Sequence, residues 1–249
     1  MIQKTEAIVL KTLPFRSSSL IVTFYTEFFG KIRGLAKGVR GENEKRGMPF
    51  ELFTRLEIIF YEKTRSDLHL VSDAVITEPY DSLRSNLESI AVASYFADLV
   101  DELTEVHDAN EKIFTLLDFG YRYLASLPPK RVARLFETNL LAEIGWLPYL
   151  EACVQCGANA EQGFFSARQG ALVCAKCAPT FPEALPLSRE ALSILRYYTR
   201  HLLEESIKLG ISRPAGAELE KLMDRFFLER LNRPLKTRQF LEKIKPVLK

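Results

Sequence analysis

The pattern of apolar and polar residues from residue 5 to residue 76 is that of short β-strands. The apolar runs are short and rich in β-branched residues, as in the stretch 20–26, LIVTFYT. Gly30 follows at a position where a turn needs a positive φ. A polar, glycine-bearing stretch at 40–49 predicts a loop. The predicted strands cover residues 5–12, 20–26, 31–39, 54–62 and 67–75.

Five strands within about 75 residues, with no helical stretch among them, predict a small closed barrel or sandwich. A five-stranded barrel of the oligonucleotide-binding (OB) type fits the number and size of the strands. An SH3-like barrel fits the spacing almost as well, so the strand pattern alone leaves both architectures open.

The period becomes helical after Pro79, where apolar residues recur at steps of three and four. Pro128 and Pro129 are expected to end one helix, Gly145 to close the next, and Ser188 to cap a third. The predicted helices cover residues 83–103, 113–124, 132–144, 188–201, 215–231 and 236–244. The fold class is therefore α+β, and we expect a barrel domain at 1–79 followed by an α-helical domain at 80–249.

Four cysteines lie in one short stretch of this helical part, as two Cys-x-x-Cys pairs separated by seventeen residues. Cys153 and Cys156 form the first pair, and Cys174 and Cys177 form the second. This spacing is typical of a tetrahedral zinc site, here a zinc-ribbon-like module at 150–180. Four thiolates leave no open position, so we expect one structural Zn²⁺ per chain. A dithiol redox pair, an iron–sulfur cluster and an empty site remain as alternatives.

The composition describes an ordinary folded chain of 249 residues, of which 47% are hydrophobic, with a net charge of +2. These values exclude a wholly disordered chain. No stretch approaches the roughly 20 apolar residues of a membrane span. The first residues show no export signal, so we expect a cytoplasmic location.

No pattern in the sequence favours covalent catalysis. There is no P-loop, and the three histidines do not stand in a metal-ligand spacing. Asp98, Asp101, Glu102 and Glu105 share one side of a predicted helix, which suits either a nuclease metal site or a solvated acidic face. We therefore expect a protein that is not an enzyme, with a metal-dependent nuclease as the third-ranked alternative.

Basic residues favour a nucleic-acid partner instead. In the predicted strand 31–39, Ile32 and Ala36 share one face, whereas Lys31, Arg33 and Lys37 form an outward row that suits phosphates. The rival interpretation is an interaction scaffold whose basic residues only improve solubility and which makes no direct DNA contact. The candidate DNA-binding residues are Arg16, Lys31, Arg33, Lys37, Arg40, Lys45 and Arg46.

Several segments resemble the bacterial DNA repair protein RecO family. They are TEAIVLK at 5–11, SLIVT at 19–23 and GKIRGLAKG at 30–38, followed by the hairpin at 56–70 and the four-cysteine insertion. The resemblance covers nearly the whole chain. It implies an N-terminal OB-fold, a helical domain and a structural zinc module.

The resemblance also implies a non-catalytic role in the RecF pathway of recombinational repair, in the cytoplasm and associated with the nucleoid. The implied partners are single- and double-stranded DNA, RecR and the acidic C-terminal tail of single-strand-binding protein (SSB), with indirect links to RecA and RecF and none to a membrane. The implied activities are strand annealing and, with RecR, loading of RecA on SSB-coated DNA. An acidic peptide with an apolar end would suit a groove near Lys130, Arg131 and Arg134.

One departure from the family pattern concerns the loop after Lys37. That loop is densely basic in the family, whereas here Glu42 and Glu44 accompany Lys45 and Arg46.

Overall fold

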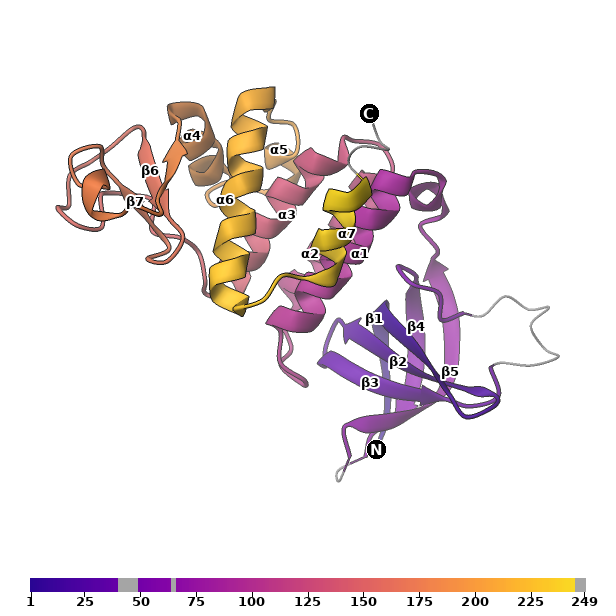
Figure 1. Cartoon of the computed structure of the whole chain (residues 1–249). Coiled ribbons are helices and arrows are strands. Elements are labelled where there is room, and N and C mark those ends of the chain that lie inside the picture. The colour runs from indigo at the N-terminus through magenta and orange to yellow at the C-terminus, as the bar shows by residue number, and fades with distance from the viewer. Residues whose placement is uncertain (40–48, 64–65, 245–249) are drawn as a thin grey trace. The chain divides into compact units, whose positions relative to one another are not determined.

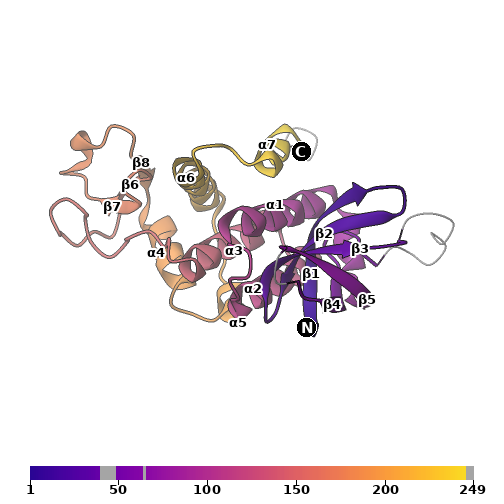
Figure 2. The same ribbon diagram turned by 90° about the horizontal axis from the view of Figure 1, so that it is seen from below.

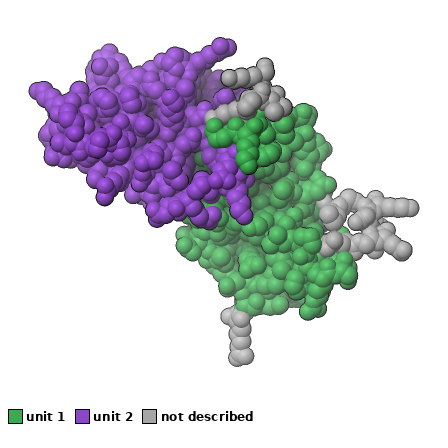
Figure 3. Space-filling model, in the orientation of Figure 1, with its two compact units in different colours: residues 1–127, 240–249 green, residues 128–239 purple. Residues whose placement is uncertain are grey.

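The computed structural model describes residues 1–39, 49–63 and 66–244. The chain divides into two compact units, which Figure 3 shows in different colours. Unit 1 consists of Met1–Leu127 with Phe240–Lys249, and unit 2 consists of Pro128–Gln239. The barrel thus shares its unit with the two helices that follow it. The domain boundary expected between residues 79 and 80 stays a prediction.

Unit 1 contains a closed five-stranded barrel in the order β1-β2-β3-β5-β4 (Figure 1). The long strand β1 pairs with β2 and with β4, and β3 runs parallel to β5. This order is that of an OB-type barrel, so the OB-fold prediction is confirmed and the SH3-like alternative is wrong. The strands are β1 (Ile2–Phe15), β2 (Ser19–Thr26), β3 (Gly30–Ala36), β4 (Arg55–Tyr61) and β5 (Leu68–Glu78).

Strand alternation builds the core of the barrel. Ile32 and Ala36 point into it, as the pattern predicted, and Phe24 is fully buried among them. Gly30 adopts a φ of +61° in the β2–β3 turn and lies against the backbone of Asp108, where any side chain would collide. Burial of these apolar side chains stabilises the barrel by roughly 25 cal/mol for each Å² of apolar surface removed from water.

Helices of unit 1 lie beside the barrel in both views (Figures 1 and 2). Asn86 and Asn110 accept hydrogen bonds from the first turns of α1 and α2, which fixes where these helices begin. The Tyr25 hydroxyl donates to the carbonyl of Asn110, the N-cap of α2, at 3.3 Å, so the start of α2 covers this part of the outer barrel surface. The elements are the 3₁₀ helix η2 (Asp81–Ser85), α1 (Leu87–Leu103) and α2 (Glu111–Leu124).

Unit 2 joins helices to a small three-stranded sheet in the order β7-β6-β8. Phe165 of β6 packs against Phe226 of α6, with ring centroids 5.8 Å apart. Helix α7 (Lys236–Ile244) contributes residues to both units. The other elements are α3 (Pro129–Glu143), β6 (Gly163–Ser166), β7 (Ala171–Val173), η3 (Ala178–Thr180), β8 (Leu185–Leu187), α4 (Arg189–Tyr198), α5 (Leu203–Ser206) and α6 (Arg213–Leu231).

The helix boundaries follow the predicted pattern closely. Ser188 caps α4 by accepting from the Ala191 amide, and Gly145 follows α3 with a φ of +74°. Pro129 begins α3, because a proline in the first turn lacks only an N–H that would be unpaired there. None of the described helices combines the length and apolar character needed to span a membrane.

Candidate metal centre and nucleic-acid interface

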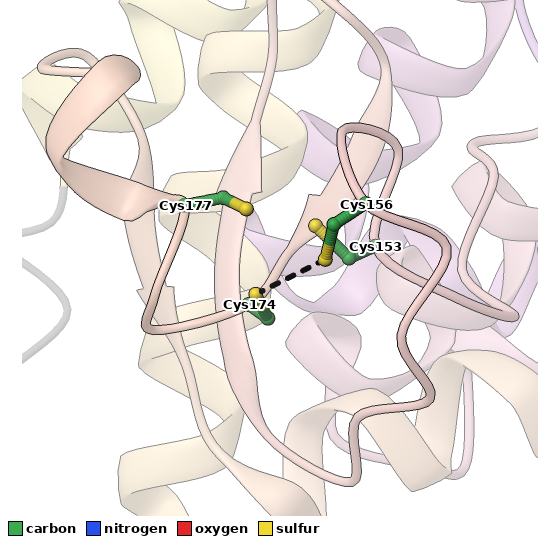
Figure 4. Close-up of side chains that lie close together, drawn as sticks. All are labelled: Cys153, Cys156, Cys174 and Cys177. Atoms are coloured by element: carbon green, nitrogen blue, oxygen red, sulfur yellow. Dashed lines mark hydrogen bonds between the residues drawn. The ribbon is translucent and has the colours of Figure 1, made fainter.

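The two cysteine pairs meet in unit 2. Cys153 and Cys156 lie in the segment between α3 and β6, whereas Cys174 directly follows β7 and Cys177 precedes η3. The four Sγ atoms lie within 4.8 Å of one another. Figure 4 shows the sulfurs turned toward a common point. The predicted clustering of the four cysteines is confirmed.

Backbone hydrogen bonds shape both turns. The Gly157 amide donates to the Cys153 carbonyl at 2.8 Å, and Gly157 adopts a φ of +71°. In the second pair, the amide of Cys177 donates to the Cys174 carbonyl at 3.0 Å. The Val154 amide donates to β7 at 2.9 Å, which ties the first turn to the strand that leads to the second. Local hydrogen bonds therefore shape both turns that carry the thiols.

The spacing of the sulfurs fits a tetrahedral ion. Zn–S bonds of about 2.3 Å require edges of about 3.8 Å between sulfurs. The Sγ atoms of Cys156 and Cys174 are 3.8 Å apart, far longer than a disulfide bond. Burial raises the pKa of the Cys153 thiol, but backbone N–H groups of Cys174 and Cys156 outweigh burial and lower this pKa to about 6. These thiols can therefore hold a metal ion.

The acidic residues considered for a nuclease do not form such a group. Among the residues that the structure describes, the four cysteines are the one cluster whose donor atoms could hold a metal ion. Asp101 instead forms an ion pair with Lys31 in unit 1.

The cationic candidates in β3 and just after it differ in how exposed their side chains are. Arg33 and Lys37 are exposed, as predicted. Lys31 is only 8% exposed, and its ammonium lies 3.5 Å from an Asp101 carboxylate oxygen and donates to the Asp101 carbonyl. The expectation of an outward Lys31 is therefore corrected: alternation places it on the outer side, but α1 covers that end of the strand.

Sequence reasoning missed Lys11. Strand register places Lys11 opposite Thr23, and Thr23 opposite Arg33, so their side chains form one row across three strands. A register shift between Val9 and Lys11 brings Lys11 to this side. The shift appears only when β1 and β2 pair, so no local pattern marks Lys11 as part of this row.

The remaining candidates differ in what the structure says of them. Arg16 lies exposed in the β1–β2 turn with a φ of +54°, and its guanidinium stacks on the Phe15 ring at 5.3 Å. Arg40, Lys45 and Arg46 lie outside the described residues. Their predicted role in DNA contact stays a prediction.

Pairing distinguishes the exposed row from other cations of unit 1. Lys4 pairs with Glu57 at 2.8 Å, and Arg55 pairs with Glu6 at 2.7 Å. Lys11, Arg33 and Lys37 make no ion pair with any other described residue. We call these three the cationic face of the barrel.

A cavity of about 600 Å³ opens within unit 2, between α3 and the start of α6. Arg134 is 3% exposed and donates to Glu137 at 2.8 Å. Its Nε and Nη1 atoms have no hydrogen-bond partner among the described residues. Cationic lining residues are Lys130, Arg131, Arg134 and Arg213, and apolar ones are Pro128, Ile211 and Ala217.

Comparison with known families matches both parts of the chain. A family model described as "Recombination protein O N terminal" matches residues 1–80, and one described as "Recombination protein O C terminal" matches residues 84–239.

Curated relatives match over nearly the full length. The chain is 33% identical over 248 residues to the DNA repair protein RecO of Anaeromyxobacter dehalogenans (strain 2CP-C), which covers 98% of each chain. It is 31% identical over 247 residues to that of Syntrophus aciditrophicus (strain SB), covering 97% of this chain and 95% of the relative. It is also 31% identical to that of Roseiflexus sp. (strain RS-1), covering 100% and 88%.

Proposed function

This chain belongs to the RecO family of DNA repair proteins, and from that premise we propose that it is a non-catalytic DNA-binding mediator of recombinational repair. It binds single- and double-stranded DNA through the cationic face and promotes the annealing of complementary strands. With RecR, it helps to load RecA on DNA that is coated by SSB. RecF is an indirect partner in the same pathway.

The unpaired cationic face is the observation that supports DNA contact most directly. Lys11 of β1, Arg33 of β3 and Lys37 just after β3 are exposed and make no ion pair with a described carboxylate. A DNA backbone supplies the missing negative charge and releases its condensed counterions. Neutralising the phosphates of two strands also reduces the repulsion that opposes annealing. The exposed Arg16 extends this surface at the β1–β2 turn.

We propose that the four cysteines hold one structural Zn²⁺. Zinc suits four thiolates at these sulfur separations, and it would crosslink the two turns that carry the cysteine pairs. Because four thiolates complete the coordination shell, the ion would supply stability and no position for a reacting water molecule.

The acidic tail of SSB is the partner that we assign to the cavity of unit 2. Lys130 and Arg213 are exposed at its rim, and the unsatisfied Arg134 nitrogen atoms suit a carboxylate. The lining by Ile211 and Ala217 suits an apolar end of the peptide. Cationic side chains for an acidic segment and apolar side chains for an apolar end thus occur together in one cavity.

Charge reversal on the barrel tests the DNA-binding proposal. We expect Arg33→Glu with Lys37→Glu to weaken binding of a fluorescent oligonucleotide at least about tenfold and to slow annealing, because two phosphate contacts become repulsive. Lys130→Glu with Arg213→Glu changes the net charge equally and serves as the control. If the barrel variant binds and anneals DNA like the wild type, the rival interpretation holds, in which the protein is an interaction scaffold and its basic residues do not contact DNA.

The same two variants, with test and control exchanged, examine the assignment of the acidic peptide to the cavity. A labelled peptide with several aspartates and a terminal phenylalanine should bind the wild type, and Lys130→Glu with Arg213→Glu should weaken it at least about tenfold, because two charge-assisted contacts are lost. The barrel variant should leave peptide affinity unchanged. Equal peptide binding by all three proteins would contradict the assignment.

A further inference from the structure

Cys156 is the most accessible of the four clustered thiols. It is exposed, whereas Cys174 and Cys177 are partly buried and Cys153 is only 2% exposed. The Cys153 sulfur also lies against the backbone N–H groups of Cys156 and Cys174. A bound zinc ion would keep all four groups as thiolates, which is the form that an oxidant attacks. An oxidant that arrives from solution therefore meets Cys156 first.

A second sulfur that could form a disulfide lies close to Cys156. The Sγ atom of Cys174, on the other turn, is 3.8 Å from the Sγ atom of Cys156 (Figure 4). A disulfide has about 2.05 Å between its sulfurs, so a shift of less than about 2 Å joins them. The backbone brings the two turns together here, because the Val154 amide donates to the Leu172 carbonyl of β7 at 2.9 Å and Cys174 directly follows β7.

The two turns differ in how unit 2 holds them. Arg196 of α4 donates to the carbonyls of Leu150 and Ala160, at 3.1 and 3.3 Å, so the stretch that carries the first cysteine pair is anchored at both ends. The hydrogen bonds that the structure gives residues 175–182 all have local partners, three or four residues away. A metal ion bound by Cys177 would link this segment to the first turn.

We propose that the cysteine cluster is an oxidative modification site, at which a peroxide joins Cys156 to Cys174 in a disulfide and thereby releases the metal ion. The inference rests on the proposed structural zinc and adds a reaction that removes it. Cys153 and Cys177 remain as thiols, and two donors do not complete a tetrahedral zinc site. Loss of the ion frees the segment at 175–182, whereas the disulfide keeps the first turn tied to β7.

The reaction needs no reactant besides peroxide and solvent protons. The Cys156 thiolate attacks one oxygen of hydrogen peroxide, the O–O bond breaks and hydroxide leaves, so that Cys156 becomes a sulfenic acid. The Cys174 thiolate then attacks the Cys156 sulfur, an S–S bond forms and a second hydroxide leaves. Two protons from solvent convert both hydroxides to water. The two thiolates together lose two electrons, and the peroxide gains them.

The test titrates the zinc-loaded wild-type protein with hydrogen peroxide. We expect about one zinc ion to be released for each disulfide formed, as measured with a chromophoric zinc indicator, because each disulfide removes two of the four ligands. Peptide mapping should find Cys156 linked to Cys174, and dithiothreitol with added zinc should restore the metal. A disulfide within either cysteine pair, zinc that stays bound after oxidation, or thiols that resist excess peroxide would overturn the inference.

Two serine variants give a matched comparison. Cys177→Ser and Cys156→Ser each remove one thiolate, so they weaken the metal site in the same way. Only Cys177→Ser keeps the two sulfurs that we assign, and it should form an intramolecular disulfide at least about tenfold faster than Cys156→Ser, because the exposed sulfur is retained. Equal rates would contradict the assignment. The wild-type peptide map does not depend on how either variant folds.

Hydrogen exchange distinguishes oxidation from simple loss of the metal. Peroxide should accelerate exchange at 175–182 and leave exchange at 150–160 slow, whereas a chelator should accelerate both, because no disulfide then ties the first turn to β7. The same exchange pattern after both treatments would refute the crosslink. Purified protein without zinc would refute the structural metal itself, whereas zinc-containing protein with a different disulfide would refute only the pairing proposed in this section.

Discussion

The barrel and the cysteine module are stabilised in different ways, and the difference determines what their polar side chains can do. The barrel is held by a closed apolar core, so Arg33 and Lys37 on its surface are not needed for folding. The module has three short strands and gathers four thiols at one point. Its four thiols face one another. The exposed cations of the barrel are therefore free to bind an external ligand, as we propose for DNA.

Removal of the metal should give the largest effect and should separate the two regions. We expect a strong chelator, or Cys174→Ser, to unfold the module, because structural zinc contributes of the order of 10 kcal/mol in small zinc domains. Hydrogen exchange should accelerate in residues 150–180, and slow exchange in β1–β5 should persist. Elemental analysis should find one zinc per chain. Exchange that accelerates equally in barrel and module, or not at all, would contradict the comparison.

Two residues within the barrel differ in a similar way. Lys31 is buried in a structural contact, whereas Arg33 is exposed. The two residues stand on one side of one strand, but only Lys31 is buried against Asp101. We expect Lys31→Glu to lower the free energy of unfolding by about 3 kcal/mol, because a largely buried carboxylate would then lose its cation.

Arg33→Glu is the matched control for that substitution. It should change the free energy of unfolding by less than about 0.5 kcal/mol, because the side chain is exposed and makes no described ion pair. Urea unfolding of both variants measures the difference. Similar, small effects of the two substitutions would contradict the burial of Lys31 beneath α1.

Local pattern predicted much of this molecule. Alternation placed Ile32 inside the barrel and Arg33 outside, and the spacing of the cysteines was enough to predict their cluster. Helical spacing gave every α-helix longer than four residues in the described chain. These features depend on neighbours in sequence, so a single sequence contains them.

Features that depend on distant segments were not predictable in this way. The cover over Lys31 comes from Asp101, seventy residues later, and no local pattern records it. Strand β8 has three residues, one of them Pro186, and its pairing with β6 defines it. Lys11 reaches the cationic face through a register shift that appears only when β1 and β2 pair. The cavity of unit 2 needs α3 and α6 together.

The salt dependence of single-strand binding tests the central claim most directly. If the exposed cations bind phosphates, log K should fall with log salt by about 0.7 for each phosphate contacted, or about 2 for Lys11, Arg33 and Lys37 together. Arg33→Glu with Lys37→Glu should reduce this slope by about 1.4. A wild-type slope near zero, or the same slope in both proteins, would contradict the claim that unpaired cations on the barrel hold the DNA backbone.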